Sequence, residues 1–104
     1  MNLVIVNRHH KNFDTMVSVY CGRGSALGNP HKISANCTRD QACDLYDQDL
    51  RKAVQGGPSP IIDQLIKIVR ISREHGICNL VCSCAPARCH TQSIVDVLSE
   101  LEAK

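Results

Sequence analysis

A nine-residue segment, from Cys82 to His90, holds most of the side chains that could do chemistry. Its thiols can act as nucleophiles or metal ligands once deprotonated, and its imidazole can exchange a proton or bind a metal. An apolar run, Ile77–Val81, precedes the segment, and a helical pattern, Ser93–Leu101, follows it. The segment therefore lies where a buried strand meets a helix. Ligands gather at such junctions because strand ends open a crevice and helix starts present N–H groups.

One interpretation of the segment is a zinc site. Its ligands would be Cys82, Cys84, Cys89 and His90. Sulfur and imidazole nitrogen are the ligands that structural zinc prefers. The spacing is not that of a Cys-x-x-Cys knuckle, however, and the adjacent Cys89 and His90 converge on one ion only with an irregular backbone. Zinc is therefore the alternative, and our leading expectation is that the segment holds no metal and no cofactor.

A second interpretation is an activated thiol at Cys84 or Cys89. A helix N-terminus and the neighbouring Arg88 and His90 would each favour the thiolate form. The catalytic candidates are therefore Cys84, Cys89 and His90. In a third interpretation the cysteines are small packing residues around a binding crevice, the ordinary role of a buried cysteine such as Cys82. Arg88 and His90 would then contact the ligand, and the sequence leaves these interpretations open.

A glycine-rich loop after the second predicted strand supplies the other candidate residues. Three glycines within seven residues allow backbone conformations that other residues resist, and such loops often bind phosphate through backbone N–H groups. Arg23 could add a bidentate grip on an anion. The loop has neither a Walker sequence nor a GxGxxG fingerprint, so an ordinary irregular turn is the competing interpretation. The ligand-binding candidates are Gly22, Arg23, Gly24, Gly28, Asn29, Pro30 and Arg88.

Three short segments have the composition of strands that would position both motifs. Leu3–Val6 and Ile77–Cys84 are predominantly apolar without alternation, which is typical of strands buried on both faces. We therefore expect these two strands at the centre of the sheet. Met16–Tyr20 alternates between apolar and other residues and predicts a further strand.

Three helices are predicted from their end signals and apolar spacing. Thr38 and Gln41 fit a capping box at the start of the first helix, and a glycine pair stops it. Ser59 and Pro60 fit the N-cap and first position of the second helix, and Gly76 fits its end. The third helix has apolar residues at helical spacing near the carboxyl end of the chain, and the sequence does not fix where it starts.

These elements predict one α/β domain spanning residues 1–104, a usual length for a single domain. We expect a short, mainly parallel or mixed sheet of three or more strands, with three helices packed on it. Hydrophobic residues make up 43% of the chain, and aromatic residues only 3%, so the core is small and aliphatic. A domain of this size is only modestly stable, which leaves room for a homodimer.

Charge and cysteine content argue against several classes of protein. A net charge of +2 and three aromatic residues give little support to a nucleic-acid partner. The seven cysteines are an odd number, and the first residues read as a strand, so a secreted disulfide scaffold is not expected. No apolar run approaches the roughly 20 residues that span a bilayer. We expect a cytoplasmic protein with reduced thiols and no membrane contact.

Two motifs carry a resemblance to a known family. They are Gly22-Arg23-Gly24 with Gly28-Asn29-Pro30, and the Cys-x-Cys-x-Pro-x-x-Cys-His pattern from Cys82 to His90. In this order they resemble a family of small phage and bacterial proteins, the domain of unknown function 4326. The likeness covers most of the chain. It implies that the family shares a site at these motifs, but it does not name an activity. Phage and bacterial relatives also imply that the protein works in the cytoplasm of a bacterial host cell. A more distant likeness to Rossmann-like nucleotide-handling domains concerns the fold alone.

Together these observations predict a nucleotide- or phosphosugar-binding protein with a crevice between the loop Gly22–Pro30 and the turn Cys82–His90. Arg23 and Arg88 would hold the phosphate of a small phosphorylated ligand, and Asn29 would orient it. An imidazole or thiol of the turn would move protons or act as the nucleophile, as in an enzyme of nucleotide or nucleoside metabolism. The sequence leaves open whether a reaction occurs. The alternative is a zinc-stabilised module that binds a host protein or nucleic acid.

Overall fold

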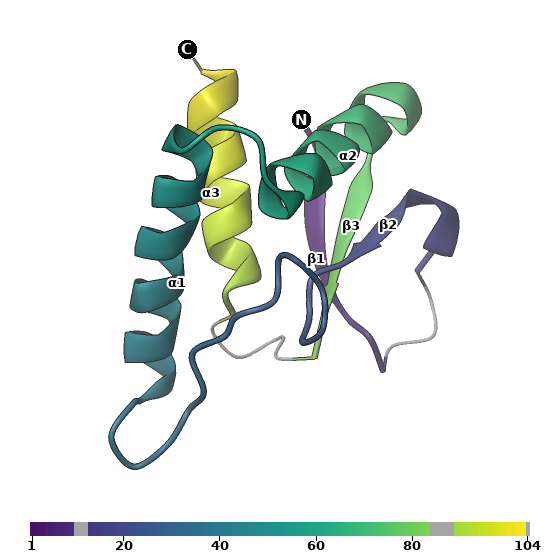
Figure 1. The fold of residues 1–104 in the computed structure, drawn as a ribbon. Coiled ribbons are helices and arrows are strands. Elements are labelled where there is room, and N and C mark those ends of the chain that lie inside the picture. The colour runs from purple at the N-terminus through teal and green to yellow at the C-terminus, as the bar shows by residue number, and fades with distance from the viewer. Residues whose placement is uncertain (10–12, 84–88, 104) are drawn as a thin grey trace.

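Short strands and three longer helices build the part of the chain described by the computed structural model, residues 1–9, 13–83 and 89–103 (Figure 1). The elements in chain order are β1 (Leu3–Asn7), a 3-10 turn η1 (Thr15–Val17), β2 (Ser18–Tyr20), α1 (Arg39–Gln55), α2 (Pro60–His75), β3 (Cys78–Cys82) and α3 (Thr91–Glu102). The described residues thus form the α/β fold that the sequence predicts, with three helices and a three-stranded parallel sheet.

The interior strand of the sheet is β3, because the strand order is β1-β3-β2. Leu80 of β3 pairs with Ile5 of β1 on one side and with Val19 of β2 on the other, both in parallel. All five residues of β3 are buried, as expected for a predominantly apolar strand. The strand starts one residue later than predicted and ends at Cys82, and Cys84 lies outside the described residues.

The prediction that Leu3–Val6 lies at the centre of the sheet is wrong, because β1 is an edge strand. A sheet of three strands has only one interior position, and β3 occupies it. Val4 is 36% exposed, and the other four residues of β1 are half-buried. One face of β1 packs toward the core and α3, which is sufficient to account for its apolar sequence.

The strand β2 is shorter than predicted because the chain winds into η1 just before it. The carboxylate of Asp14 accepts a hydrogen bond from the Met16 amide at 2.9 Å. The backbone carbonyl of Asp14 accepts a second bond from the Ser18 hydroxyl at 2.6 Å. These local bonds stabilise a turn at Met16 and Val17, where the alternating sequence alone predicts extended chain.

The predicted ends of the first two helices are confirmed. At the start of α1, the Thr38 side chain accepts a bond from the Gln41 amide, and the Gln41 side chain accepts one from the Thr38 amide. Ser59 caps α2 by accepting a bond from the Ile62 amide, and Gly76 ends that helix with a φ of +79°. The third helix begins at Thr91, and His90 precedes it as the N-cap residue without a side-chain capping bond.

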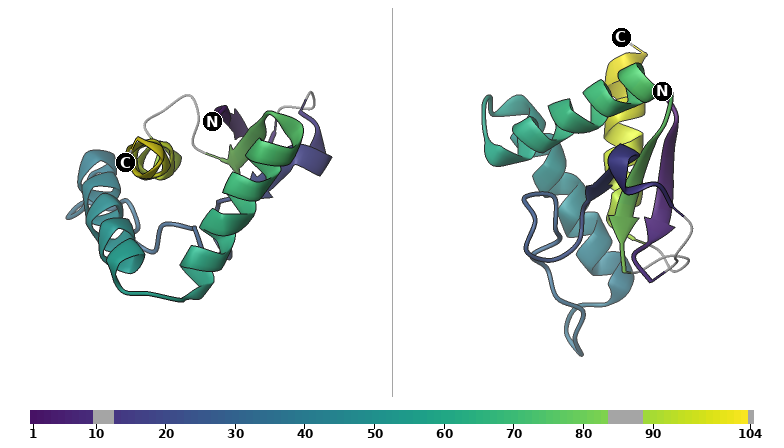
Figure 2. Two further views of the ribbon diagram at one scale, coloured as in Figure 1. Left: turned by 90° about the horizontal axis from the view of Figure 1, so that it is seen from above. Right: turned by 90° about the vertical axis from the view of Figure 1, so that its right-hand side faces the viewer.

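All three helices lie on one side of the sheet, as the two views of Figure 2 show. On the other side, where no helix of the described residues lies, Val4 and Tyr20 are exposed. A doubly wound Rossmann sheet carries helices on both faces, so the Rossmann-like interpretation is not confirmed. None of the helices among the described residues is long and apolar enough to cross a membrane.

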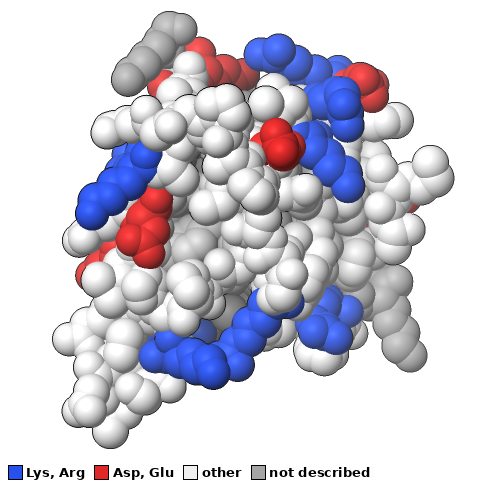
Figure 3. Space-filling model, viewed as in Figure 1, with Lys and Arg blue, Asp and Glu red and all other residues white. Residues whose placement is uncertain are grey.

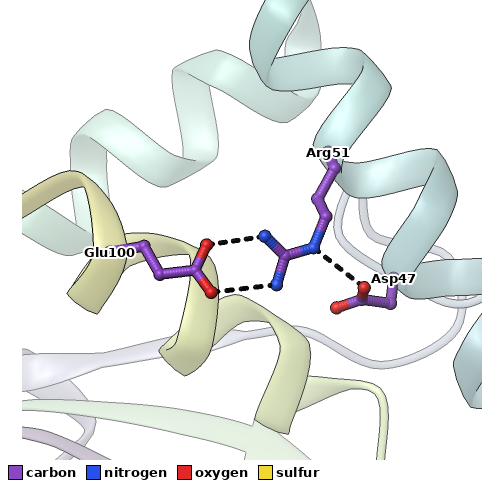
Figure 4. Close-up of polar contacts among 3 residues, drawn as sticks. All are labelled: Asp47, Arg51 and Glu100. Carbon is purple, nitrogen blue, oxygen red and sulfur yellow. Dashed lines mark hydrogen bonds and ion pairs between the residues drawn. The ribbon is translucent and has the colours of Figure 1, made fainter.

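The core fills the space between the sheet and the helices. Its buried members are Val19, Cys21, Leu27, Tyr46, Leu50, Leu65, Ile68, Cys78, Leu80, Ile94, Val97 and Leu98. At its surface, Arg51 of α1 holds α3 through a bidentate pair with Glu100, at 2.6 and 3.2 Å, and bonds Asp47 of its own helix at 2.9 Å (Figure 4). The paired helices α1 and α3 thereby fix where their amino-terminal ends lie relative to the strand ends.

Candidate functional site

A pocket of about 240 Å³ lies where the chain leaves the carboxyl ends of β2 and β3. Five predicted site residues line it: Gly22, Arg23, Asn29, Cys89 and His90. The structure thus brings the glycine-rich loop and the end of the cysteine segment to one cavity. Carboxyl ends of parallel strands are the usual place for ligands in α/β proteins.

The imidazole of His90 is held from both of its nitrogens. Its Nε2 lies 2.5 Å from the backbone carbonyl oxygen of Cys21, and its Nδ1 lies 3.5 Å from the sulfur of Cys89. A carbonyl oxygen can only accept, so Nε2 must carry the hydrogen. In the neutral ring Nδ1 is then the acceptor, and the Cys89 thiol donates to it.

The surroundings of His90 favour its neutral form. The side chain is buried at 6% exposure, and the ring of Tyr46 packs edge-on against it, with centroids 4.9 Å apart and planes at 72°. Burial lowers the pKa of His90, and the hydrogen bond to the Cys21 carbonyl partly opposes this effect. The ring is therefore neutral at neutral pH and can accept a proton at Nδ1.

Close packing accounts for Gly28 of the loop, and backbone conformation accounts for Gly24. A Cβ atom on Gly28 would lie 2.5 Å from the carbonyl oxygen of Gly22, and Gly24 has a φ of +89°. The amides of Ser25 and Gly28 donate within the loop, to the carbonyls of Gly22 and Ser25 at 3.2 and 3.0 Å. Those two amides are therefore occupied and are not available to a phosphate.

The remainder of the loop is anchored on α1. The Tyr46 hydroxyl donates to the carbonyl of the buried Leu27 at 2.8 Å. The Asn29 side-chain amide donates to the Ala42 carbonyl at 3.1 Å, and its oxygen accepts from the His31 amide at 2.9 Å. Both polar ends of Asn29 are thus used to brace the loop, whereas the sequence predicts that this residue orients a ligand.

Positive charge gathers around the mouth of the pocket. Arg23 lines the 240 Å³ pocket together with Arg39, the first residue of α1. A neighbouring pocket of about 250 Å³ shares Arg23 and Asn29 and adds Pro30 and Lys32. Figure 3 shows a band of Lys and Arg side chains in the lower part of the view, where Figure 1 places the chain between β2 and α1. This end of the molecule is therefore suited to an anion.

Sequence reasoning missed three polar residues that line the pocket, namely Arg39, His31 and Ser83. Arg39 lies inside the capping box, so its sequence context predicts only an ordinary helix residue. His31 lies in a loop and pairs with Asp49 of α1 at 2.6 Å. The positions of Arg39 and His31 depend on the conformation of residues 29–38 between the glycine-rich loop and α1. No local sequence pattern predicts that conformation.

The zinc alternative finds no support in the described residues. Of its four proposed ligands, Cys84 lies outside them, as does the ligand-binding candidate Arg88. Cys82 is fully buried in β3 and does not line the pocket, and both nitrogens of His90 are engaged as described above. Among the residues that the structure describes, no group of three or more His, Cys, Asp and Glu side chains could hold a metal ion.

Comparison with known families gives one finding. The model of the family described as Domain of unknown function (DUF4326) matches residues 5–100. The chain belongs to this family. The match extends from β1 into α3, so the expected membership of this family is confirmed. No curated protein and no solved structure matches the chain significantly.

Proposed function

We propose that the 240 Å³ pocket binds a small phosphorylated ligand, a phosphosugar or a nucleotide. The observation that carries the proposal is the meeting of Arg23 and Arg39 on one small cavity at the strand ends. The two residues come from separate segments, and a planar guanidinium matches the oxygens of a phosphate in a bidentate way. Within the described residues Arg23 has no carboxylate partner, so its charge is available to an anion.

The size of the cavities limits the ligand. Drug-sized ligands usually occupy roughly 300–1,000 Å³, and 240 Å³ is enough for a phosphate with a small attached group. We expect a phosphosugar to occupy the first pocket alone. A nucleotide would place its phosphate beside Arg23 and extend into the second pocket of about 250 Å³, whose wall includes Lys32.

A thermal-shift screen against sugar phosphates, nucleotides and their unphosphorylated counterparts tests this proposal. A ligand that binds only the folded chain stabilises it by about 2.7 kcal/mol at about 100 times its Kd, which raises the melting temperature by several degrees. We expect Arg23→Gln to lose this response. Arg70→Gln is the matched control, because Arg70 is an exposed residue of α2 that does not line the site.

Two outcomes would contradict the proposal. In the first, no phosphorylated compound raises the melting temperature more than its unphosphorylated counterpart. In the second, Arg23→Gln responds as the wild type does while Arg70→Gln does not. The second outcome would move the anion site to the basic face of α2.

A further inference from the structure

The Cys89–His90 pair has the geometry of a thiol nucleophile with its base. Sγ lies 3.5 Å from Nδ1, and the opposite nitrogen is fixed by the Cys21 carbonyl. Cysteine nucleophiles in unrelated enzymes are paired with a histidine in the same arrangement. One ring nitrogen of the histidine faces the thiol, and the other donates to an oxygen that orients the ring. Both side chains line the pocket, although each is only 6% exposed.

The Cys21 carbonyl determines which nitrogen of His90 can accept the proton of the Cys89 thiol. Because Nε2 keeps its hydrogen, only Nδ1 can take the proton of the Cys89 thiol. The imidazolium so formed would donate from Nε2 to the carbonyl and from Nδ1 to the thiolate, and both bonds would be stronger than those of the neutral ring. The carbonyl therefore orients the ring and also stabilises the charge that appears on it.

Two other buried thiols, those of Cys21 and Cys78, are poor nucleophiles. Burial raises the pKa of Cys21 to about 12, with the neighbouring Cys78, Cys82 and Cys89 adding to the effect. Burial likewise raises the pKa of Cys78 to about 11, with Lys67 opposing it. Neither residue lines the pocket. Cys43 of α1 lines the pocket, so the comparison residue for experiments on Cys89 is the half-buried Cys37, which does not line it.

The size of the pocket indicates which atom of a ligand the thiol would meet. Arg23 and Arg39 line the same pocket of 240 Å³ as Cys89, so a phosphate held by either guanidinium would share this small cavity with the sulfur. Building on the proposed function, we infer that Cys89 attacks the phosphorus of a small phosphomonoester bound in this pocket, with His90 as the general base and acid.

The inferred reaction is a two-step hydrolysis with water as the co-reactant. In the first step the thiol proton moves to Nδ1 of His90, the sulfur forms a bond to phosphorus, and the ester P–O bond breaks. The leaving alkoxide takes the Nδ1 proton and departs as an alcohol. In the second step Nδ1 takes a proton from water, the hydroxide oxygen bonds to phosphorus, and the S–P bond breaks. The thiolate recovers its proton from His90, and inorganic phosphate leaves.

The test combines a trapping experiment with a separate binding measurement. The wild-type protein is mixed with an aryl phosphate, quenched under denaturing conditions and examined by intact-mass and peptide mass spectrometry. We expect a phosphoryl group on the peptide that contains Cys89, and release of the phenol. Binding of inorganic phosphate is measured in parallel by thermal shift, because it reports on the pocket without any reaction.

Variants then separate chemistry from structure. Cys89→Ser is expected to bind inorganic phosphate but to release no phenol and form no adduct, whereas Cys37→Ser should still release phenol and form the adduct. His90→Gln is expected to lower kcat by about 10²- to 10⁴-fold, the usual contribution of a general base. Should Cys89→Ser fail to fold, the adduct in the wild-type protein still decides the question.

The outcomes distinguish the two proposals. Phosphate binding without an adduct or phenol release would overturn the nucleophile assignment and leave the binding function intact. An adduct on another cysteine would overturn it as well. Failure of the wild-type protein to bind phosphate or any phosphorylated compound would contradict both.

Discussion

His90 donates its Nε2 hydrogen to the backbone carbonyl oxygen of Cys21 across 2.5 Å, and this bond joins the start of α3 to the end of β2. Cys21 is in turn fixed to β3, because its amide donates to the Val81 carbonyl at 2.8 Å. The imidazole is therefore positioned by the backbone of the sheet. The arrangement of the pocket follows from the pairing of β2 with β3.

The hydroxyl of Tyr46 stabilises the glycine-rich loop, and its removal should be measurable. In Tyr46→Phe the carbonyl of the buried Leu27 loses its 2.8 Å partner, at a cost of about 1–3 kcal/mol for an unsatisfied buried group. Chemical denaturation of the variant should show this loss in the free energy of unfolding. Tyr20→Phe, at a residue that is 40% exposed, should change it by much less. Equal losses of unfolding free energy in Tyr46→Phe and Tyr20→Phe would show that the hydrogen bond to Leu27 does not cause the destabilisation.

A side chain at Gly28 should destabilise the protein, although the sequence around Gly28 does not predict this effect. The Cβ of Gly28→Ala would lie 2.5 Å from the Gly22 carbonyl oxygen, so the loop must shift, at about 1–3 kcal/mol. Gly56→Ala is the matched control, because its Cβ would meet nothing closer than 3.4 Å and its φ is −84°. That control should be neutral or stabilise by up to about 1 kcal/mol. A Gly28→Ala variant that is as stable as the wild type and still binds phosphate would contradict the described loop.

Buried thiols should make the fold sensitive to alkaline pH. The pKa of Cys21 rises from its ordinary 9.0 to about 12, so above pH 9 the unfolded chain loses a proton that the folded chain keeps. The stabilisation from this thiol is therefore complete below about pH 9 and is lost as the pH rises toward 12. Unfolding free energies across this range should fall less steeply in Cys21→Ala than in the wild type. Parallel curves would contradict the assigned pKa of Cys21.

Local signals were sufficient to predict the ends of the first two helices. The capping box of Thr38 and Gln41 and the end signal at Gly76 act through residues within one or two turns, so the sequence contains the whole cause. The order of the strands does not have a local cause. Whether Leu3–Val6 lies inside the sheet or at its edge depends on which strand pairs with β3 on each side, and apolar composition does not specify that pairing.

The candidate site was predictable to a similar extent. Gly22, Arg23, Cys89 and His90 stand out by residue type, and parallel strands bring their segments to the same edge. Arg39 belongs to the pocket only because Asn29 and Tyr46 fix the loop against α1. Gly28 is conspicuous in the sequence for its conformational freedom, but the structure requires it because another backbone atom approaches closely.

The most direct test of a phosphate site is an amide NMR titration with inorganic phosphate. Among the residues that the structure describes, exposed basic side chains lie beside the pocket and also on α2, where Lys67, Arg70 and Arg73 are exposed. We predict that the resonances of Gly22, Arg23, Ser83 and His90 shift together along one binding curve, and that Arg23→Gln abolishes these shifts. Phosphate-dependent shifts confined to the α2 residues, or shifts at the pocket that persist in Arg23→Gln, would contradict it.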